Sequence, residues 1–178
     1  MAINNKTFNN VINTLKQLGA EHDQIATTTS GDIFEIDFND KNTKFPLFHI
    51  NPVNVTAAEA TLTYNFQLFV MDAVGENSNW TNANFQSANN QSNQQEVLSS
   101  CLQICTDIIS VFTNSKWQSQ LTNDIDAPVY FSDVDFTLDP FSERFDNELT
   151  GWVFNIGIIV HNDFQTCNIP MENNPIGK

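Results

Sequence analysis

Apolar and polar side chains alternate through the stretch from Glu59 to Met71, which is the most regular pattern in this chain. Successive side chains of a strand point to opposite faces, so the alternation predicts a strand with one buried face. That face would carry Ala60, Leu62, Tyr64, Phe66, Leu68 and Val70. The strand is roughly twice the usual length, so we expect it to project beyond the core that it helps to form.

Four further stretches show a similar alternation and are predicted to be strands. They are Asp32–Phe38, Phe45–Ile50, Val129–Asp139 and Gly151–Val160. The turn-forming run NDKN separates the first two, which favours a hairpin, and Pro52 indicates a break over residues 51–58. One face of the last strand carries Trp152, Phe154, Ile156, Ile158 and Val160.

Apolar residues at helical spacing predict two helices. The first covers residues 5–18, with Asn4 or Asn5 as its cap and Gly19 just past its end. The second covers residues 96–112 and has an apolar stripe wide enough for a central buried helix. This stripe contains Val97, Cys101, Ile104, Cys105, Ile108 and Phe112.

The predicted elements follow the order α-β-β-β-α-β-β. Short or polar links join neighbouring strands, which favours antiparallel pairing. We therefore expect an α+β fold in which a twisted antiparallel sheet of about five strands carries both helices on one face. Residues 1–170 would form a single domain, and residues 171–178 a flexible C-terminal tail.

Acidic residues dominate the charge of the chain. The formal net charge is −14, with seven basic residues in total. Nucleic-acid binding through phosphates needs clustered Lys and Arg, so this composition argues against it. The first residues lack the apolar run of a signal peptide, and the chain contains no run of about 18 uncharged apolar residues. Neither export through a signal peptide nor a membrane span is therefore indicated, and we expect no membrane partner. The odd number of cysteines favours reduced thiols over a disulfide framework.

Candidate catalytic and metal-binding residues have simpler structural explanations. Cys101 and Cys105 are one helical turn apart, but they lie on the apolar stripe, and a metal needs four ligands. No hydrolase signature, calcium loop or glycine-rich phosphate loop is present. We therefore predict no enzyme activity, no catalytic residue, no cofactor and no metal site. The histidines and paired aspartates that we considered are His22, His49, His161, Asp124/Asp126 and Asp133/Asp135.

The charged residues between Pro140 and Gly151 are predicted to form a loop, which holds Arg144, the only arginine in the chain. The fixed φ of Pro140 and the turn-forming Gly151 would present these charges at a sheet edge. Arginine beside aromatic residues is typical of interface hot spots. The alternative is a solvated turn with local ion pairs. The predicted oligomer-interface residues are Arg144, Glu143, Asp146 and Phe145, together with Trp80 and Phe85 from the polar segment 72–95.

The layout of elements, and several segments, resemble the tail-terminator and tail-completion proteins of tailed bacteriophages. The segments are PLFHINPVNVT (46–56), TYNFQLFVMD (63–72), EVLSSCLQICTDII (96–109), FSERFDNELTGW (141–152) and CNIP (167–170). The resemblance implies a virion structural protein that forms a ring at the head–tail junction or at the upper end of the tail. It carries over no catalytic residues.

The resemblance also implies partners and a location. We expect a homo-oligomer, a hexamer or else a dodecamer, that binds other neck and tail proteins and is assembled in the cytoplasm of the bacterial host. DNA would pass through an acidic lumen without specific binding, because like charges repel. The candidate lumen residues are Glu59, Asp133 and Asp135. The alternatives are a tail-tube or baseplate subunit and a small metal-binding or hydrolytic module.

Overall fold

The computed structural model describes residues 7–36, 40–75, 93–113, 130–132, 135–144 and 148–161. Its elements are α1 (Phe8–Glu21), β1 (Thr27–Ser30), a short 3-10 helix (Ile33–Glu35), β2 (Leu47–Ala57), β3 (Thr61–Ala73), α2 (Gln94–Thr113), β4 (Phe131–Ser132), β5 (Leu138–Arg144) and β6 (Glu148–His161). The predicted α+β class and element order are confirmed, with β4 and β5 in place of the single strand expected at 129–139. The tail predicted at 171–178 lies outside the described residues.

Within the described residues one sheet has six strands, five of them in the order β1-β2-β3-β6-β4. β5 pairs with β6 on the same side as β4, but nearer the start of β6. β1 runs parallel to β2, and all other pairs are antiparallel. The sheet is therefore mixed, and only its β1 edge departs from the antiparallel pairing that the sequence predicts.

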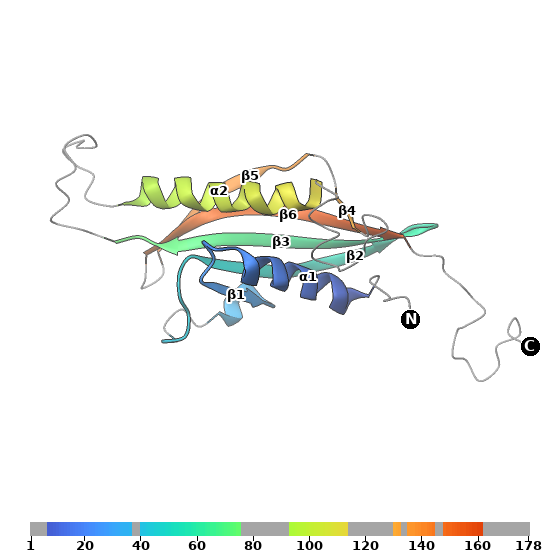
Figure 1. The fold of residues 1–178 in the computed structure, drawn as a ribbon, viewed down its shortest axis with the longest axis horizontal. Helices are drawn as coiled ribbons and strands as arrows, with labels where there is room; N and C mark the ends of the chain where they lie inside the picture. Colours follow the sequence, from blue (N-terminus) through green and yellow to red (C-terminus); the bar gives the residue numbers. More distant parts are fainter. Residues whose placement is uncertain are drawn as a thin grey trace, which may run out of the picture.

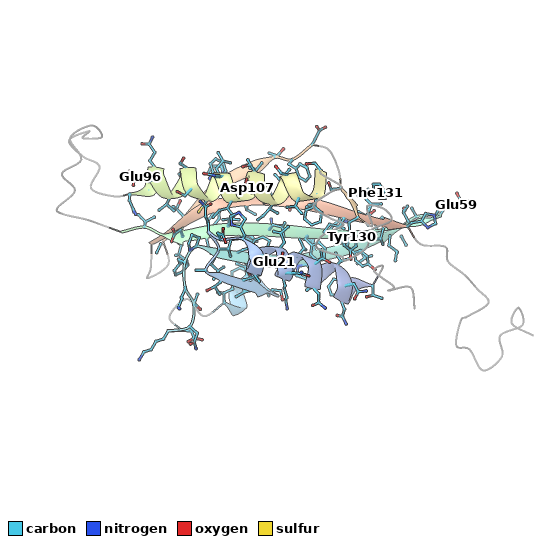
Figure 2. The ribbon with its side chains drawn as sticks, in the orientation of Figure 1. Glu21, Glu59, Glu96, Asp107, Tyr130 and Phe131 are labelled. Carbon is cyan, nitrogen blue, oxygen red and sulfur yellow. The ribbon has the colours of Figure 1, made fainter. Side chains whose placement is uncertain are left out.

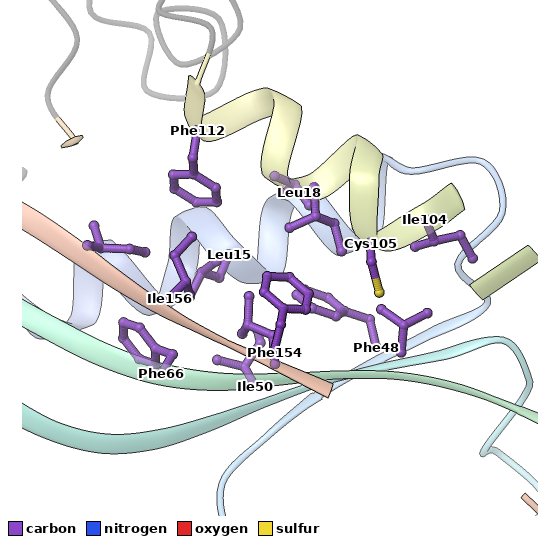
Figure 3. Close-up of a cluster of buried hydrophobic side chains, with 14 of the residues drawn as sticks. Leu15, Leu18, Phe48, Ile50, Phe66, Ile104, Cys105, Phe112, Phe154 and Ile156 are labelled. Carbon is purple, nitrogen blue, oxygen red and sulfur yellow. The ribbon is translucent and has the colours of Figure 1, made fainter. Parts of the chain in front are cut away.

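Both helices cover one face of the sheet, with α1 near β1 and β2 and α2 along β6 (Figure 1). The alternating apolar residues of the strands meet the helices in one buried cluster, part of which Figure 3 shows. The burial expected from the alternation is confirmed in the central part of both long strands. On the face toward the helices, β3 buries Tyr64, Phe66, Leu68 and Val70, and β6 buries Phe154, Ile156, Ile158 and Val160.

The central helix α2 buries the stripe that its sequence predicts, from Val97 to Phe112. By length and composition alone α2 could cross a membrane. Its apolar stripe packs against the sheet, however, as is usual for the core helix of a globular domain. The indole nitrogen of Trp152 on β6 donates a hydrogen bond of 2.8 Å to the carbonyl of Leu98, which fixes the start of α2 over the sheet.

Gly19 lies inside α1 and not beyond its end, which corrects the predicted boundary. The helix begins after Thr7 and not after Asn4 or Asn5, since the Thr7 hydroxyl accepts a hydrogen bond of 3.3 Å from the backbone N–H of Asn10. A Cβ at position 19 would overlap the Thr28 hydroxyl and lie 2.7 Å from the Phe48 ring. Glycine thus allows α1 to pack closely on the sheet, and it does not serve as a helix stop.

The strand predicted at Asp32–Phe38 is wrong over its described part, residues 32–36, and its hairpin is wrong as well. Three strands do precede α2, but the first of them is β1, which runs parallel to β2. Asp32 accepts a hydrogen bond of 3.0 Å from the Phe34 N–H and caps the 3-10 helix. This capped turn places Ile33 and Ile36 against a second buried cluster, on the sheet face away from the helices. The cluster consists of Leu47, Met71 and Leu149.

The break predicted at residues 51–58 is also wrong, because β2 continues through Pro52 to Ala57. β2 and β3 form a long antiparallel hairpin that turns at residues 58–60. The chain accommodates the proline through an irregularity in strand pairing between Pro52 and Asn54. A bulge in an edge strand is a common place for a proline, since its nitrogen has no hydrogen to donate to a neighbour.

The segment between Pro140 and Gly151, predicted to be a charged loop, is mostly strand. β5 continues to Arg144 and β6 begins at Glu148, and these two residues are paired. Pro140 lies inside β5 opposite Trp152, and not at the entrance to a loop. The edge position makes this possible, since β5 pairs only with β6 among the described strands. The connecting residues 145–147 lie outside the described residues.

Candidate assembly surface

The β2–β3 hairpin extends past the strand that flanks it. β1 pairs with β2 only from Leu47 to Ile50. From Asn51 onward, the outer edge of β2 has no strand partner among the described residues. Residues 53–60 are all exposed, and Figure 2 shows Glu59 at the end of the hairpin, beyond both helices. We call residues 51–67 the arm.

An open strand edge offers backbone N–H and C=O groups to another strand, and proteins usually protect such edges. Charged side chains are one such protection, and the arm has few of them. The only charged residue in it is Glu59, although the chain as a whole carries a net charge of −14. Pro52 and the pairing irregularity interrupt the start of the edge, which leaves Val53 to Ala57 available.

Two valines of the arm are exposed to solvent. Val53 is 55% exposed and Val55 is 50% exposed. Val55 lies opposite Tyr64 in the hairpin. It is therefore on the same face of the sheet as the two helices, which cover that face closer to the core. Exposed β-branched residues on an open edge are suited to packing against an added strand.

The opposite face of the arm is polar but uncharged. Asn54 lies opposite Asn65, and the Asn65 amide donates a hydrogen bond of 2.7 Å to the Asn54 side-chain oxygen. Thr56 lies opposite Thr63 in the same way. Hydroxyl and amide groups can hydrogen-bond a neighbour without the repulsion that carboxylates of like-charged subunits would cause.

The structure describes only some of the interface residues that the sequence predicts. The backbone of Glu143 and Arg144 forms the end of β5, paired with Leu149 and Glu148. These two residues therefore lie at a sheet edge, as expected, but in a strand. Their role in an interface stays a prediction. The other four predicted residues, Phe145, Asp146, Trp80 and Phe85, lie outside the described residues.

Among the predicted lumen residues, Glu59 and Asp135 are both exposed, and Asp133 lies outside the described residues. Glu59 and the end of β5 lie at opposite ends of the sheet, because β3 pairs with β6 from Thr61 at one end to Ala73 at the other. At about 3.3 Å per residue, this separates them by about 40 Å. The arm tip and the end of β5 therefore cannot contribute to one site on a single subunit.

No family model, curated protein or solved structure matches this chain. The arm, as a candidate site, therefore rests on the geometry and charge described above. Its sequence signal is weak, since residues 51–67 carry one charge but residues 77–95 carry none. The break expected at Pro52 conceals this signal, because a break assigns the segment to a loop instead of an exposed strand.

The cysteine pair has the structural role that the sequence favours. Cys101 and Cys105 are fully buried in the main core. In the described part of the chain, no three His, Cys, Asp or Glu side chains are grouped to hold a metal ion. Burial raises the pKa of each thiol to about 12, and for Cys101 the nearby Asp72 carboxylate contributes as well.

These thiols should be unreactive in the folded protein. At pH 8 a thiol with a pKa of about 12 is ionised to roughly one part in ten thousand, and the thiolate is the reactive form. We expect a thiol reagent to label neither cysteine within minutes in a Cys167→Ser background, and to label both after addition of denaturant. Rapid labelling without denaturant would contradict the burial.

His49 and Thr29 are the described pair that most resembles a catalytic base and nucleophile. The Thr29 hydroxyl lies 2.8 Å from Nδ1 of His49, and Nε2 lies 3.1 Å from the Gly31 carbonyl. Nε2 must carry the proton to donate to that carbonyl, so Nδ1 accepts from the threonine. With 1% of its surface exposed, His49 is closed to a substrate. The pair fastens β1 to β2.

Burial lowers the pKa of His49 below its usual value near 6.5, against smaller opposing effects of Gly31 and Asp32. A lowered pKa means that the unfolded chain binds a proton more readily than the folded one. The stability that neutral His49 contributes is thus complete above pH 6.5 and is lost as the pH falls below it, at up to about 1.4 kcal/mol per pH unit.

Urea unfolding at pH 7.5 and 5.5 should show this loss in the wild type and a smaller one in His49→Gln. Glutamine is a matched control, because it can bond both partners and does not titrate in this range. Equal pH dependence of the unfolding free energy in the two proteins would contradict the assignment.

Proposed function

We propose that this chain is a non-enzymatic virion structural protein of a tailed phage, which forms a closed oligomeric ring at the head–tail junction or at the upper end of the tail. The phage assignment rests on the resemblance of the element order and segments, and the observation that carries the oligomeric assembly is the arm, an exposed hairpin with an open edge and a single charge in a strongly acidic chain. Such a surface suits contact between identical copies.

Electrostatics limits where copies of this chain can meet. Each subunit has a net charge of −14, so two copies repel each other over most of their surfaces. Contacts over uncharged hydroxyl, amide and valine side chains avoid that cost. The arm supplies all three kinds of group, and its open edge supplies backbone hydrogen bonds as well.

Ring closure requires a contact between two different surfaces of the subunit, repeated by rotation. The arm can supply one of them. The other must lie elsewhere on the neighbour, and the outer edges of β1 and of β5 are available because each pairs with one strand among those described. We propose that the arm of one subunit binds along one of these edges of the next.

The acidic residues outside the contacts would then serve the passage of DNA. A lumen lined by carboxylates repels phosphates, so DNA slides through without adhering. Glu59 and Asp135 are exposed and are our candidates for this lining, together with Asp133. Other neck and tail proteins would bind the ring, and the assembled ring would form part of the virion.

Electron microscopy of the purified protein tests the type of assembly. The proposal predicts discrete rings with a central hole and a fixed number of subunits, and the protein should also be found in purified virions. Long tubes would favour the tail-tube alternative instead, since an open helical assembly arises when the repeated rotation does not close.

A further inference from the structure

A groove separates the end of α1 from the middle of α2, on the helical side of the molecule. Its volume is about 490 Å³. Apolar side chains of Leu18, Ile108 and Val111 line it, and acidic side chains surround them. Figure 2 labels two of these acids, Glu21 and Asp107, on the helices that flank the groove.

The electrostatics of this groove are unfavourable in the isolated subunit. The carbonyl end of a helix carries partial negative charge and is stabilised by cations. The last turn of α1 instead contains Glu21 and no basic residue, and Asp23 follows it in the groove wall. No Lys or Arg is among the residues that line the groove in the described part of the chain. A partner that brings positive charge would relieve this repulsion.

Local contacts offset the negative charge only in part. The uncharged side-chain amide of Gln17 donates a hydrogen bond of 2.8 Å to the Glu21 carboxylate and does not neutralise its charge. Nε2 of His22 lies 3.5 Å from the Asp107 carboxylate, which is half exposed at 51%. The groove therefore keeps accessible carboxylates around the partly exposed Val111, above Leu18 and Ile108, which are themselves buried. This arrangement is complementary to a helix with a short apolar face flanked by lysine or arginine.

We propose that this groove binds a basic amphipathic helix of a different protein. A second copy of this chain is a poor occupant, because α2 contains no basic residue and α1 contains only Lys16. A bound metal ion is not favoured either, since the described residues include no cluster of three potential ligands. The inference does not depend on the ring proposal.

The test uses a designed peptide of about 18 residues, enough for five helical turns, with leucine on one face and lysine along both sides. Calorimetry should show saturable binding to the wild type, and Asp107→Lys should weaken it at least about tenfold. Glu96→Lys is the matched control, because Glu96 is exposed on the same helix, outside the groove, and the charge change is equal. This control should weaken binding less than about twofold.

Two results would overturn the inference. The first is an absence of saturable binding, and the second is equal weakening by Asp107→Lys and Glu96→Lys, which would indicate attraction to the net charge alone. Amide NMR shifts give an independent readout, since the peptide should perturb residues 18–24 and 103–111 more than the arm.

Discussion

Replacing Gly151 with alanine is expected to destabilise the fold by at least about 3 kcal/mol, which is at the upper end for overpacking. Gly151 lies on β6 opposite Met71 of β3, with β5 on its other side. An added Cβ would overlap the Val70 carbonyl oxygen and lie 2.8 Å from the Met71 Cα. Both are backbone atoms, so relief requires β3 and β6 to separate locally.

Urea unfolding followed by circular dichroism measures this loss. Gly75→Ala is the matched control, because an added Cβ there meets no atom within 4 Å, and its effect should stay within about 0.5 kcal/mol. If Gly151→Ala has an unfolding free energy within about 1 kcal/mol of the wild type, the close approach of β6 to β3 at this position is incorrect.

Replacing Val55 with aspartate is expected to abolish self-assembly and leave the subunit folded. Val55 is half exposed, so a polar substitution costs the monomer little. In an assembled interface the new carboxylate would be desolvated among subunits that already repel each other. Loss of an interface hot spot costs about 2 kcal/mol or more, so the dissociation constant should rise by at least about thirtyfold.

Phe34→Asp is the matched control for this experiment. Phe34 is 88% exposed, lies in the 3-10 helix away from the arm, and undergoes the same change from apolar to acidic. Sedimentation velocity should show the wild-type oligomer for Phe34→Asp and monomer for Val55→Asp. Equal oligomers in both variants would exclude the arm as the assembly surface.

Long regular patterns predict their elements correctly because tertiary packing agrees with them. In β3 every second residue from Tyr64 to Val70 is buried. In α2 the whole predicted apolar stripe, from Val97 to Phe112, is buried. Both elements lie in the centre of the fold. There, the period of the apolar residues matches the period with which side chains face the core.

Short patterns fail where a local interaction competes with the periodicity. The alternation at residues 32–38 indicates a strand, but the Asp32 cap stabilises a turn that buries parts of Ile33 and Ile36. Pro52 indicates a break, but the strand pairing has an irregularity at that point and β2 continues. Neither structure follows from the sequence period alone. The capped turn packs against a cluster from β2, β3 and β6, and the irregularity at Pro52 is in the pairing of β2 with β3.

The candidate site is harder to predict than the fold. An arginine among aromatic residues favours the segment around Arg144, whereas the arm contains mainly Asn, Thr, Val and Ala residues. The open edge of the arm exists because β1 ends at Ser30 while β2 continues to Ala57. No pattern in the sequence indicates that difference in strand length.

Native mass spectrometry of the wild-type protein at micromolar concentration tests the central claim most directly. The proposal predicts a single closed species, of six subunits or else twelve, at a mass that is the corresponding multiple of 20.1 kDa. Monomer alone at this concentration, together with absence of the protein from purified virions, would contradict it.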